Sequence, residues 1–179
     1  TDWQRTFSYG GALVRDKDGQ ALLAVVTMRD ITEHKRAEER IRAQTERAEA
    51  LLEAAPDPIV IVDREGRIAI VNARTEAIFG YARAELLGQP VELLIPERLH
   101  AAHVTQRAPY LEQPKARAMG AGRELFARRK DGSEFAVDIS LSPLATSEGT
   151  LVISTVRDVT ERKQAERRIQ GQLEHLNLL

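Results

Sequence analysis

Apolar and polar positions follow three different patterns along the chain, and the first predicts a β-hairpin. Residues 1–32 hold two runs rich in apolar and β-branched residues, separated by the turn sequence Asp16-Lys17-Asp18-Gly19. Two strands are only marginally stable in water on their own. We therefore expect residues 1–32 to be the last strands of an upstream domain whose remainder is absent.

The second pattern is a heptad seam, and it occurs twice. Thr32 is an expected helix N-cap, and the helical pattern after it fills residues 33–55. A second helix is expected over residues 161–179. The seam positions are Ala37, Ile41, Gln44, Ala48, Leu51 and Ala55 in the first helix, and Ala165, Ile169, Gln172, Leu176 and Leu179 in the second. This spacing favours a parallel homodimeric coiled coil, although a single exposed helix also carries one apolar stripe.

The third pattern, over residues 56–160, is a domain with strands at both ends and helices between them. Pro56 ends the first helix, and Pro109 is expected to end or kink a helix that begins at Glu97. Asn72 directly follows a predicted strand and is expected to be the N-cap of the helix after it. The predicted strands are 58–62, 67–71, 124–129, 135–141 and 151–156. The pattern predicts an α+β fold, an antiparallel five-stranded sheet with helices on one face.

A repeated sequence lies where each strand region changes into a helix. Met28-Arg29-Asp30-Ile31-Thr32-Glu33 returns as Val156-Arg157-Asp158-Val159-Thr160-Glu161, and both seams begin seven residues after the aspartate. Both helices therefore start in the same phase. Thr160 is expected to cap the helix that follows, with Asp158 fixing the end of the strand against it, and Thr32 and Asp30 are their equivalents.

Composition narrows the function without assigning one. The formal net charge of −1 argues against nucleic acid or an anionic membrane as a partner, and Arg128-Arg129-Lys130 is interpreted as a solvated strand end. No segment resembles a signal peptide or a membrane span, and a cytoplasmic location fits. The absence of cysteine excludes disulfides, thiolate metal sites and chromophores bonded through sulfur.

Residues from about 51 to 162 resemble a PAS domain of the S-box type, as found in bacterial sensor histidine kinases of two-component systems. The segments that carry the resemblance are Pro58-Ile59-Val60-Ile61-Val62-Asp63, Ile70-Val71-Asn72, Phe79-Gly80-Tyr81, Glu85-Leu86-Leu87-Gly88, Arg129-Lys130-Asp131-Gly132-Ser133-Glu134-Phe135 and Arg157-Asp158-Val159-Thr160. Residues 1–32 look like the last two strands of a preceding PAS domain. In that family the Asp and Thr of the final motif join the last strand to the outgoing helix.

The resemblance implies a pocket between sheet and helices, and His103 is the sharpest candidate for contacting a ligand in it. His103 and Arg123 stand where haem-binding PAS domains of oxygen-sensing kinases place an iron ligand and an oxygen contact. A structural histidine, an unidentified small molecule, flavin and an empty core are the alternatives. Glu97, His100 and His103 are spread around their helix, so we expect no metal site.

No catalytic motif is evident in the chain. His175 is followed by Leu176-Asn177 rather than by the acidic residue of a phosphoacceptor site, so we expect a non-enzymatic segment of a longer histidine kinase. A ligand sensor that transmits through Asp158 and Thr160 is one hypothesis. A dimerisation spacer with a filled core is the other, and it would need the following side chains to fill the core: Ile61, Phe79, Phe126, Val137, Ile139 and Ile153.

Overall fold

The computed structural model describes residues 4–112, 115–119, 124–147 and 149–176, which form two compact units. The first unit spans Thr1–Leu51 and the second spans Leu52–Leu179. The first contains the predicted hairpin and most of the first helix. The second contains the predicted α+β domain and the outgoing helix.

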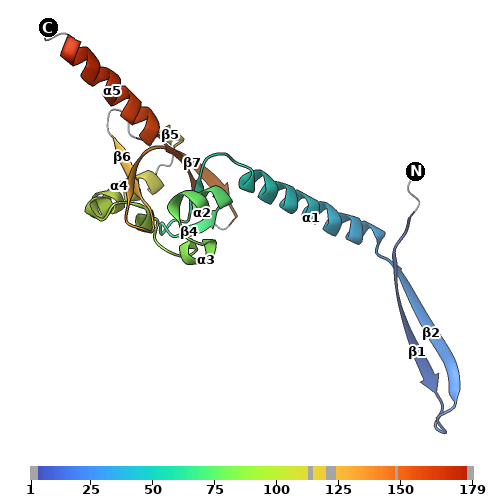
Figure 1. The fold of residues 1–179 in the computed structure, drawn as a ribbon. Helices are drawn as coiled ribbons and strands as arrows, with labels where there is room; N and C mark the ends of the chain where they lie inside the picture. The colour runs from blue at the N-terminus through green and yellow to red at the C-terminus, as the bar shows by residue number, and fades with distance from the viewer. Residues whose placement is uncertain (1–3, 113–114, 120–123, 148, 177–179) are drawn as a thin grey trace. The chain divides into compact units, whose positions relative to one another are not determined.

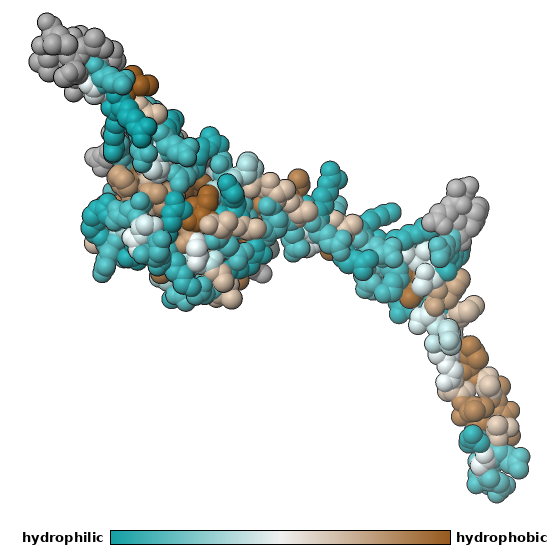
Figure 2. Space-filling model, viewed as in Figure 1, coloured by the Kyte–Doolittle hydropathy of each residue, from teal (hydrophilic) through white to brown (hydrophobic). Residues whose placement is uncertain are grey.

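The hairpin of the first unit has an apolar face that its own residues leave uncovered. Strands β1 (Phe7–Arg15) and β2 (Ala21–Asp30) pair antiparallel, with Tyr9 opposite Met28. Asp16 closes the turn by accepting hydrogen bonds from the backbone N–H groups of Asp18 and Gln20 at 2.9 and 2.8 Å. Figure 2 shows apolar residues along the hairpin. The register and alternation place these exposed residues on one face: Phe7, Tyr9, Leu13, Leu22, Val26 and Met28.

The second unit is built on an antiparallel sheet with the strand order β4-β3-β8-β7-β5, in which β6 also pairs with β7. Figure 1 labels β4, β5, β6 and β7 of this sheet. The strands are β3 (Ile59–Val62), β4 (Ile68–Val71), β5 (Arg117–Ala118), β6 (Leu125–Arg128), β7 (Glu134–Thr146) and β8 (Gly149–Asp158). Over the described residues the sheet has six strands rather than the predicted five. The sixth is the two-residue β5, which is too short to give an alternating sequence pattern.

The helical elements cover one face of this sheet. They are α2 (Ala73–Phe79), α3 (Arg83–Leu86), the 3₁₀ helices η1 (Val91–Leu94) and η2 (Glu97–Leu99), and α4 (His100–Glu112). Phe79, Leu86, Leu94 and Tyr110 bring these helices into the same buried cluster as the inner residues of the strands. Burial of this apolar surface is the main stabilising contribution to the unit.

Two helices differ from their predicted bounds. Helix α1 (Thr32–Glu53) ends two residues before Ala55, and α4 begins at His100 after a separate 3₁₀ turn that starts at Glu97. Pro109 does not end the helix, because α4 continues through it to Glu112, whereas the kink predicted as the alternative stays a prediction. A proline this close to a helix end removes a single backbone hydrogen bond, and only three residues follow it in the helix. Helix α5 (Thr160–Leu176) leaves the sheet as predicted.

Candidate functional site

The two repeated sequences form strand-to-helix joints with the same hydrogen bonds. In the first, Ile31 N–H donates to Thr6 C=O at 2.9 Å, and Thr6 N–H donates to the Thr32 hydroxyl at 2.9 Å. Asp30 Oδ1 accepts from Thr32 N–H at 3.0 Å. The hairpin and the start of α1 are thus held together by three residues of the repeat.

The second joint repeats this arrangement around the start of α5. Val159 N–H donates to Ala136 C=O at 3.0 Å, and Ala136 N–H donates to the Thr160 hydroxyl at 3.2 Å. Asp158 Oδ1 accepts from Thr160 N–H at 2.9 Å. Ala136 in the second joint therefore occupies the position of Thr6 in the first.

The capping roles are the reverse of those expected. The aspartate carboxylate accepts from the first helical N–H, as an N-cap side chain does, whereas the threonine hydroxyl binds the neighbouring strand. This exchange has a structural consequence. Thr160 belongs to α5 and is bonded to β7, so the first turn of the helix is attached to a strand other than the one that leads into it.

Asp158 is also tied to the helical layer through Arg129. The Arg129 guanidinium donates to Asp158 Oδ2 at 3.1 Å and to the carbonyl of Ile78 at the end of α2. It lies 3.9 Å from the centroid of the Phe135 ring, which in turn packs edge-on against Phe79 with 5.5 Å between centroids. Although burial acts to raise it, hydrogen bonds from Thr160 and Arg129 hold the pKa of Asp158 below its usual value.

The interpretation of Arg128-Arg129-Lys130 as a solvated strand end is wrong for Arg129, whereas Lys130 is exposed as expected. Arg129 makes the contacts above, and Lys130 forms an ion pair with Glu85 at 2.6 Å and lies 5.6 Å from the centroid of the Tyr81 ring. The predicted turn is present, since Arg129 N–H bonds Ser133 C=O at 2.9 Å and Gly132 has φ of 86°. Sequence patterning found the turn but could not show what lies beneath it.

A cavity of about 620 Å³ lies between the sheet and the helices. Val60, Ser154 and Val156 line it from the central strands, Phe79 from α2, and His103 from α4. Phe126 and Ile139 also line it, as two of the residues expected to fill the core. Ile61 and Ile153 pair with each other in the register one residue away from Val60 and Ser154, so they lie on the opposite face of the sheet.

His103 lines the cavity wall and is bonded to the buried carboxylate of Glu92. Its Nδ1 lies 2.9 Å from Glu92 Oε1, and an Arg107 nitrogen lies 3.3 Å from the same oxygen. Glu92 is only 7% exposed. Burial opposes ionisation of Glu92, but the His103 hydrogen bond and the charge of Arg107 hold its pKa below the usual value. Sequence reasoning missed Glu92, although a lone carboxylate within Val91-Glu92-Leu93-Leu94-Ile95 was an available signal.

Two other proposed ligand residues have different outcomes. Arg123 lies outside the described residues. His100 faces elsewhere, with Nε2 2.9 Å from the carbonyl of Ile95. Among the residues that the structure describes, no group of three or more His, Asp and Glu side chains is arranged to hold a metal ion.

Asn72 anchors the incoming end of the second unit and was expected only as a helix cap. It is fully buried, and its Oδ1 accepts from Ile59 N–H at 2.9 Å and from Thr75 N–H at 3.1 Å. Its Nδ2 donates to the carbonyls of Leu52 and Asp57 at 3.3 and 3.1 Å. One side chain therefore fixes the segment before β3, the strand β3 and the start of α2.

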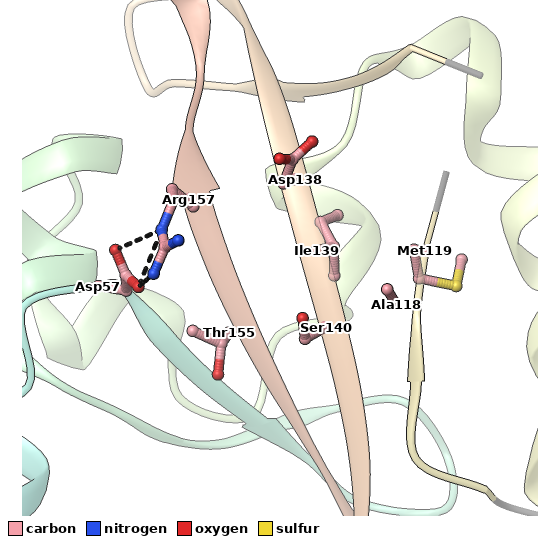
Figure 3. A pocket seen from close by; sticks show the side chains of 8 residues that line it. All are labelled: Asp57, Ala118, Met119, Asp138, Ile139, Ser140, Thr155 and Arg157. Carbon is pink, nitrogen blue, oxygen red and sulfur yellow. Dashed lines mark hydrogen bonds and ion pairs between the residues drawn. The ribbon is translucent and has the colours of Figure 1, made fainter. Parts of the chain in front are cut away.

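The incoming segment is also bonded to the outgoing strand on the outer face of the sheet (Figure 3). Arg157 donates to both oxygens of Asp57, with the shortest distance 2.6 Å. Asp138, Ser140 and Thr155 line the same open hollow of about 360 Å³. The Arg157 side chain is 67% exposed, so this pair contributes little to stability, but it holds the two ends of the unit at one site.

The predicted dimer seam is exposed at its described positions within the helices, whereas Ala55 lies beyond the end of α1 and is half-buried. Ile41 and Leu51 are 65% and 68% exposed on α1, and Ile169 is 59% exposed on α5. Ala48 is exposed as well. Leu176 lies in α5, but its side chain is outside the described residues. Within the part of the chain that the structure describes, no helix is long and apolar enough to cross a membrane.

Comparison with known proteins identifies the family to which this fold belongs. A sequence model described as "PAS domain" matches residues 56–161. The chain is 28% identical to the sensor protein FixL of Bradyrhizobium diazoefficiens over 170 residues, which cover 93% of this chain and 34% of FixL. It is 29% identical to the oxygen sensor protein DosP of Escherichia coli over 121 residues, 66% of this chain and 15% of DosP.

The chain is also similar to a protein named as a histidine kinase and to a solved PAS domain. The cell-division control histidine kinase PdhS of Brucella suis is 26% identical over 126 residues, 70% of this chain and 12% of PdhS. The PAS domain of an HTR-like protein from Haloarcula marismortui superposes with a TM-score of 0.60 at 29% identity, and covers 69% of this chain and 98% of that one. The chain spans about a third or less of the length of these full-length relatives.

Proposed function

Since the chain belongs to the PAS domain family, as its match over residues 56–161 shows, we propose that it is the sensory and relay module of a bacterial signal-transduction protein. In this proposal the second unit senses a small molecule or a partner and passes its state through Asp158 and Thr160 to α5. The catalytic domain of the longer cytoplasmic protein, a histidine kinase by analogy with PdhS, receives that state. In this proposal the module itself catalyses no reaction.

The observation that carries this proposal is the set of three hydrogen bonds that the two joints share. An Asp-Ile/Val-Thr step makes the same three hydrogen bonds at both strand–helix connections, which favours a shared role over a coincidence of local packing. We infer that residues 1–32 end a preceding PAS domain and that residues 33–55 carry its output into the domain at 56–160. The apolar face of β1 and β2 supports this, because a completed domain would bury it.

A continuous set of contacts supports a route from the cavity to α5. Phe79 lines the cavity and packs on Phe135; Arg129 lies over Phe135 and bonds Asp158. Asp158 and Thr160 then hold the first turn of α5. A displacement of α2 by a ligand would change the position of Arg129 and so bias the helix between two arrangements.

The test measures how strongly the signal changes the output of the intact receptor that carries Asp158→Asn. The variant should fold but lose most of its response to the signal, because the carboxylate that joins Arg129 to α5 is gone. Asp131→Asn is the matched control: Asp131 Oδ1 accepts from Ser133 N–H and Oγ at 2.9 and 2.6 Å in a turn that leads to no helix. Normal regulation with Asp158→Asn would refute the proposal.

Dimerisation is part of the proposed mechanism. Both seams begin seven residues after the aspartate of their joint. Each joint therefore sets the same starting orientation of its helix in the coiled coil, and a rotation of the helix at the joint would move the whole seam. The exposure of Ile41, Leu51 and Ile169 in a single chain supports pairing with a second copy of the chain, since these side chains would be buried in a parallel coiled coil.

A haem-based gas sensor is the second candidate, and the position of His103 favours it. The side chain lines the cavity, and Glu92 holds Nδ1, which leaves Nε2 as the free ring nitrogen. A carboxylate bonded to the other nitrogen is the usual support of a metal-ligating histidine. These residues fit haem: His103 would hold the iron, and the group would supply reversible binding of a diatomic gas. The similarity to an oxygen sensor protein points the same way.

An absorption spectrum separates the haem candidate from the other ligand classes. The protein is expressed with a haem precursor, and wild type is compared with His103→Ala and with His100→Ala as control. A strong Soret band that only His103→Ala removes would support haem. A colourless wild-type protein would contradict haem and flavin together, and would leave a relay module or a sensor of a colourless molecule.

A further inference from the structure

The cavity is lined unevenly, with apolar side chains over most of its wall and polar groups at one end. A smaller pocket of about 60 Å³ adjoins it, and both are lined by His103, Gln106, Arg117 and Ser154. This volume is roughly four times the ~15 Å³ that one water molecule needs, which is room for a small polar head group. The main cavity lies within the ~300–1,000 Å³ typical of small-molecule sites.

The register of the sheet places two of these polar groups on one row. Arg117 pairs with Leu141, and Leu141 pairs with Ser154, so all three side chains share the inner face. Strands lie about 4.8 Å apart, so the Arg117 and Ser154 backbones are separated by roughly 10 Å across Leu141. A bound group above Leu141 would be within reach of the arginine side chain from one side and the hydroxyl from the other.

Arg117 has no acidic partner among the described residues. Its guanidinium lies 4.7 Å from the centroid of the Tyr110 ring, and the structure records no hydrogen bond or ion pair from it. The other charges at this end are accounted for: Glu92 pairs with Arg107 and His103, and Glu124 pairs with Arg167 at 2.8 Å. Ser154 Oγ likewise has no hydrogen-bond partner in the described part of the chain. Arg117 is exposed, so solvent screens its charge, but among the described residues this end of the cavity has one guanidinium without an acidic partner and one hydroxyl without a hydrogen bond.

We propose that the cavity binds an amphipathic monocarboxylate. The carboxylate lies at Arg117 and Ser154, and the apolar body lies against Phe79, Leu94 and Phe126. A carboxylate matches a guanidinium better than a neutral group does, because the hydrogen bonds between them are charge-assisted. This ligand assignment rests on the proposed sensory function, for which it names the signal.

The test is calorimetric titration of the 179-residue protein at neutral pH with octanoate, and with octanamide, which has the same shape and no charge. Octanoate should bind one molecule per chain, and octanamide should bind at least about tenfold more weakly. Arg117→Gln should weaken octanoate binding by a similar factor. Arg74→Gln is the matched control, since Arg74 is exposed on α2 and lines neither pocket. Circular dichroism checks that each variant is folded.

Three outcomes would overturn the assignment: no binding of octanoate, equal binding of octanamide, or unchanged octanoate binding to Arg117→Gln. Ser154→Ala provides a second variant, expected to weaken octanoate by a few-fold without altering the charge. A failure here is distinguishable from failure of the relay proposal, because the Asp158→Asn experiment on the intact receptor requires no ligand in this cavity.

Discussion

Arg129 is the residue whose removal should separate the joint from the helical layer. Its guanidinium bonds Asp158 and the carbonyl of Ile78 and lies over the Phe135 ring. A hydrogen bond between charged groups contributes about 1.5–3 kcal/mol, and a cation–π contact adds about 0.5–1 kcal/mol. The side chains of Arg129 and Asp158 are 30% and 33% exposed, so solvent reduces the sum. Arg129→Gln should therefore lower the free energy of unfolding of the second unit by about 2–3 kcal/mol.

Urea unfolding followed by circular dichroism measures this change. With a slope of about 2 kcal/mol per molar urea, the midpoint should fall by roughly 1 M. Fluorescence is unsuitable, because the single tryptophan, Trp3, precedes the second unit in the sequence. Arg128→Gln is the matched control: this neighbouring side chain makes no hydrogen bond or ion pair with another described residue, so the midpoint of the variant should stay close to that of wild type.

The two variants together make the reasoning refutable. If Arg129→Gln costs less than about 0.5 kcal/mol, as expected for a surface substitution, the arginine does not tie the joint to α2 and Phe135. If both variants cost the same, the loss reflects net charge rather than the specific contacts of Arg129.

Three further predictions concern other parts of the structure. Asn72→Ala should cost about 3–4 kcal/mol in urea unfolding, because it leaves the buried Ile59 N–H unpaired and removes the cap of α2; a loss below 1 kcal/mol would contradict its anchoring role. The ionised form of Asp158 is favoured in the folded state, so its contribution to stability should be complete above about pH 4 and disappear as the pH falls through the lowered pKa; urea midpoints of Asp158→Asn should show a weaker acid dependence than wild type, and parallel curves would contradict this. Ile169→Asp should lower the sedimentation mass at micromolar concentration, whereas the off-seam Gln170→Asp should not; an unchanged mass with Ile169→Asp would refute the coiled-coil dimer.

Local sequence signals predicted the elements well where their pattern was regular. The alternation around Phe135 and Val137 predicted strand β7, and the repeat at Asp30 and Asp158 predicted both strand–helix joints. The order of strands and helices was sufficient to predict an α+β fold with a helical layer on one face of an antiparallel sheet. Strand β5 was missed because two residues carry no periodicity.

Contacts between distant segments were beyond the reach of sequence patterns. Nothing in the spacing of Arg129 and Asp158 shows that they meet, and a basic cluster before Asp131-Gly132 is ordinarily solvated. Ile61 and Ile153 were considered as core residues by type alone, whereas the strand register decides which face they occupy. The partner of His103 was Glu92, eleven residues earlier, and only the packing of η1 beneath α4 brings them together.

The most direct test of the relay is a double-mutant comparison in the intact receptor. The ratio of signalled to unsignalled output is measured for wild type, Asp158→Asn, Arg129→Gln and the double variant. The account predicts that each single substitution reduces the ratio strongly and that the double variant is no worse than either single, because both residues act through one contact. A ratio equal to that of wild type in either single variant would contradict it.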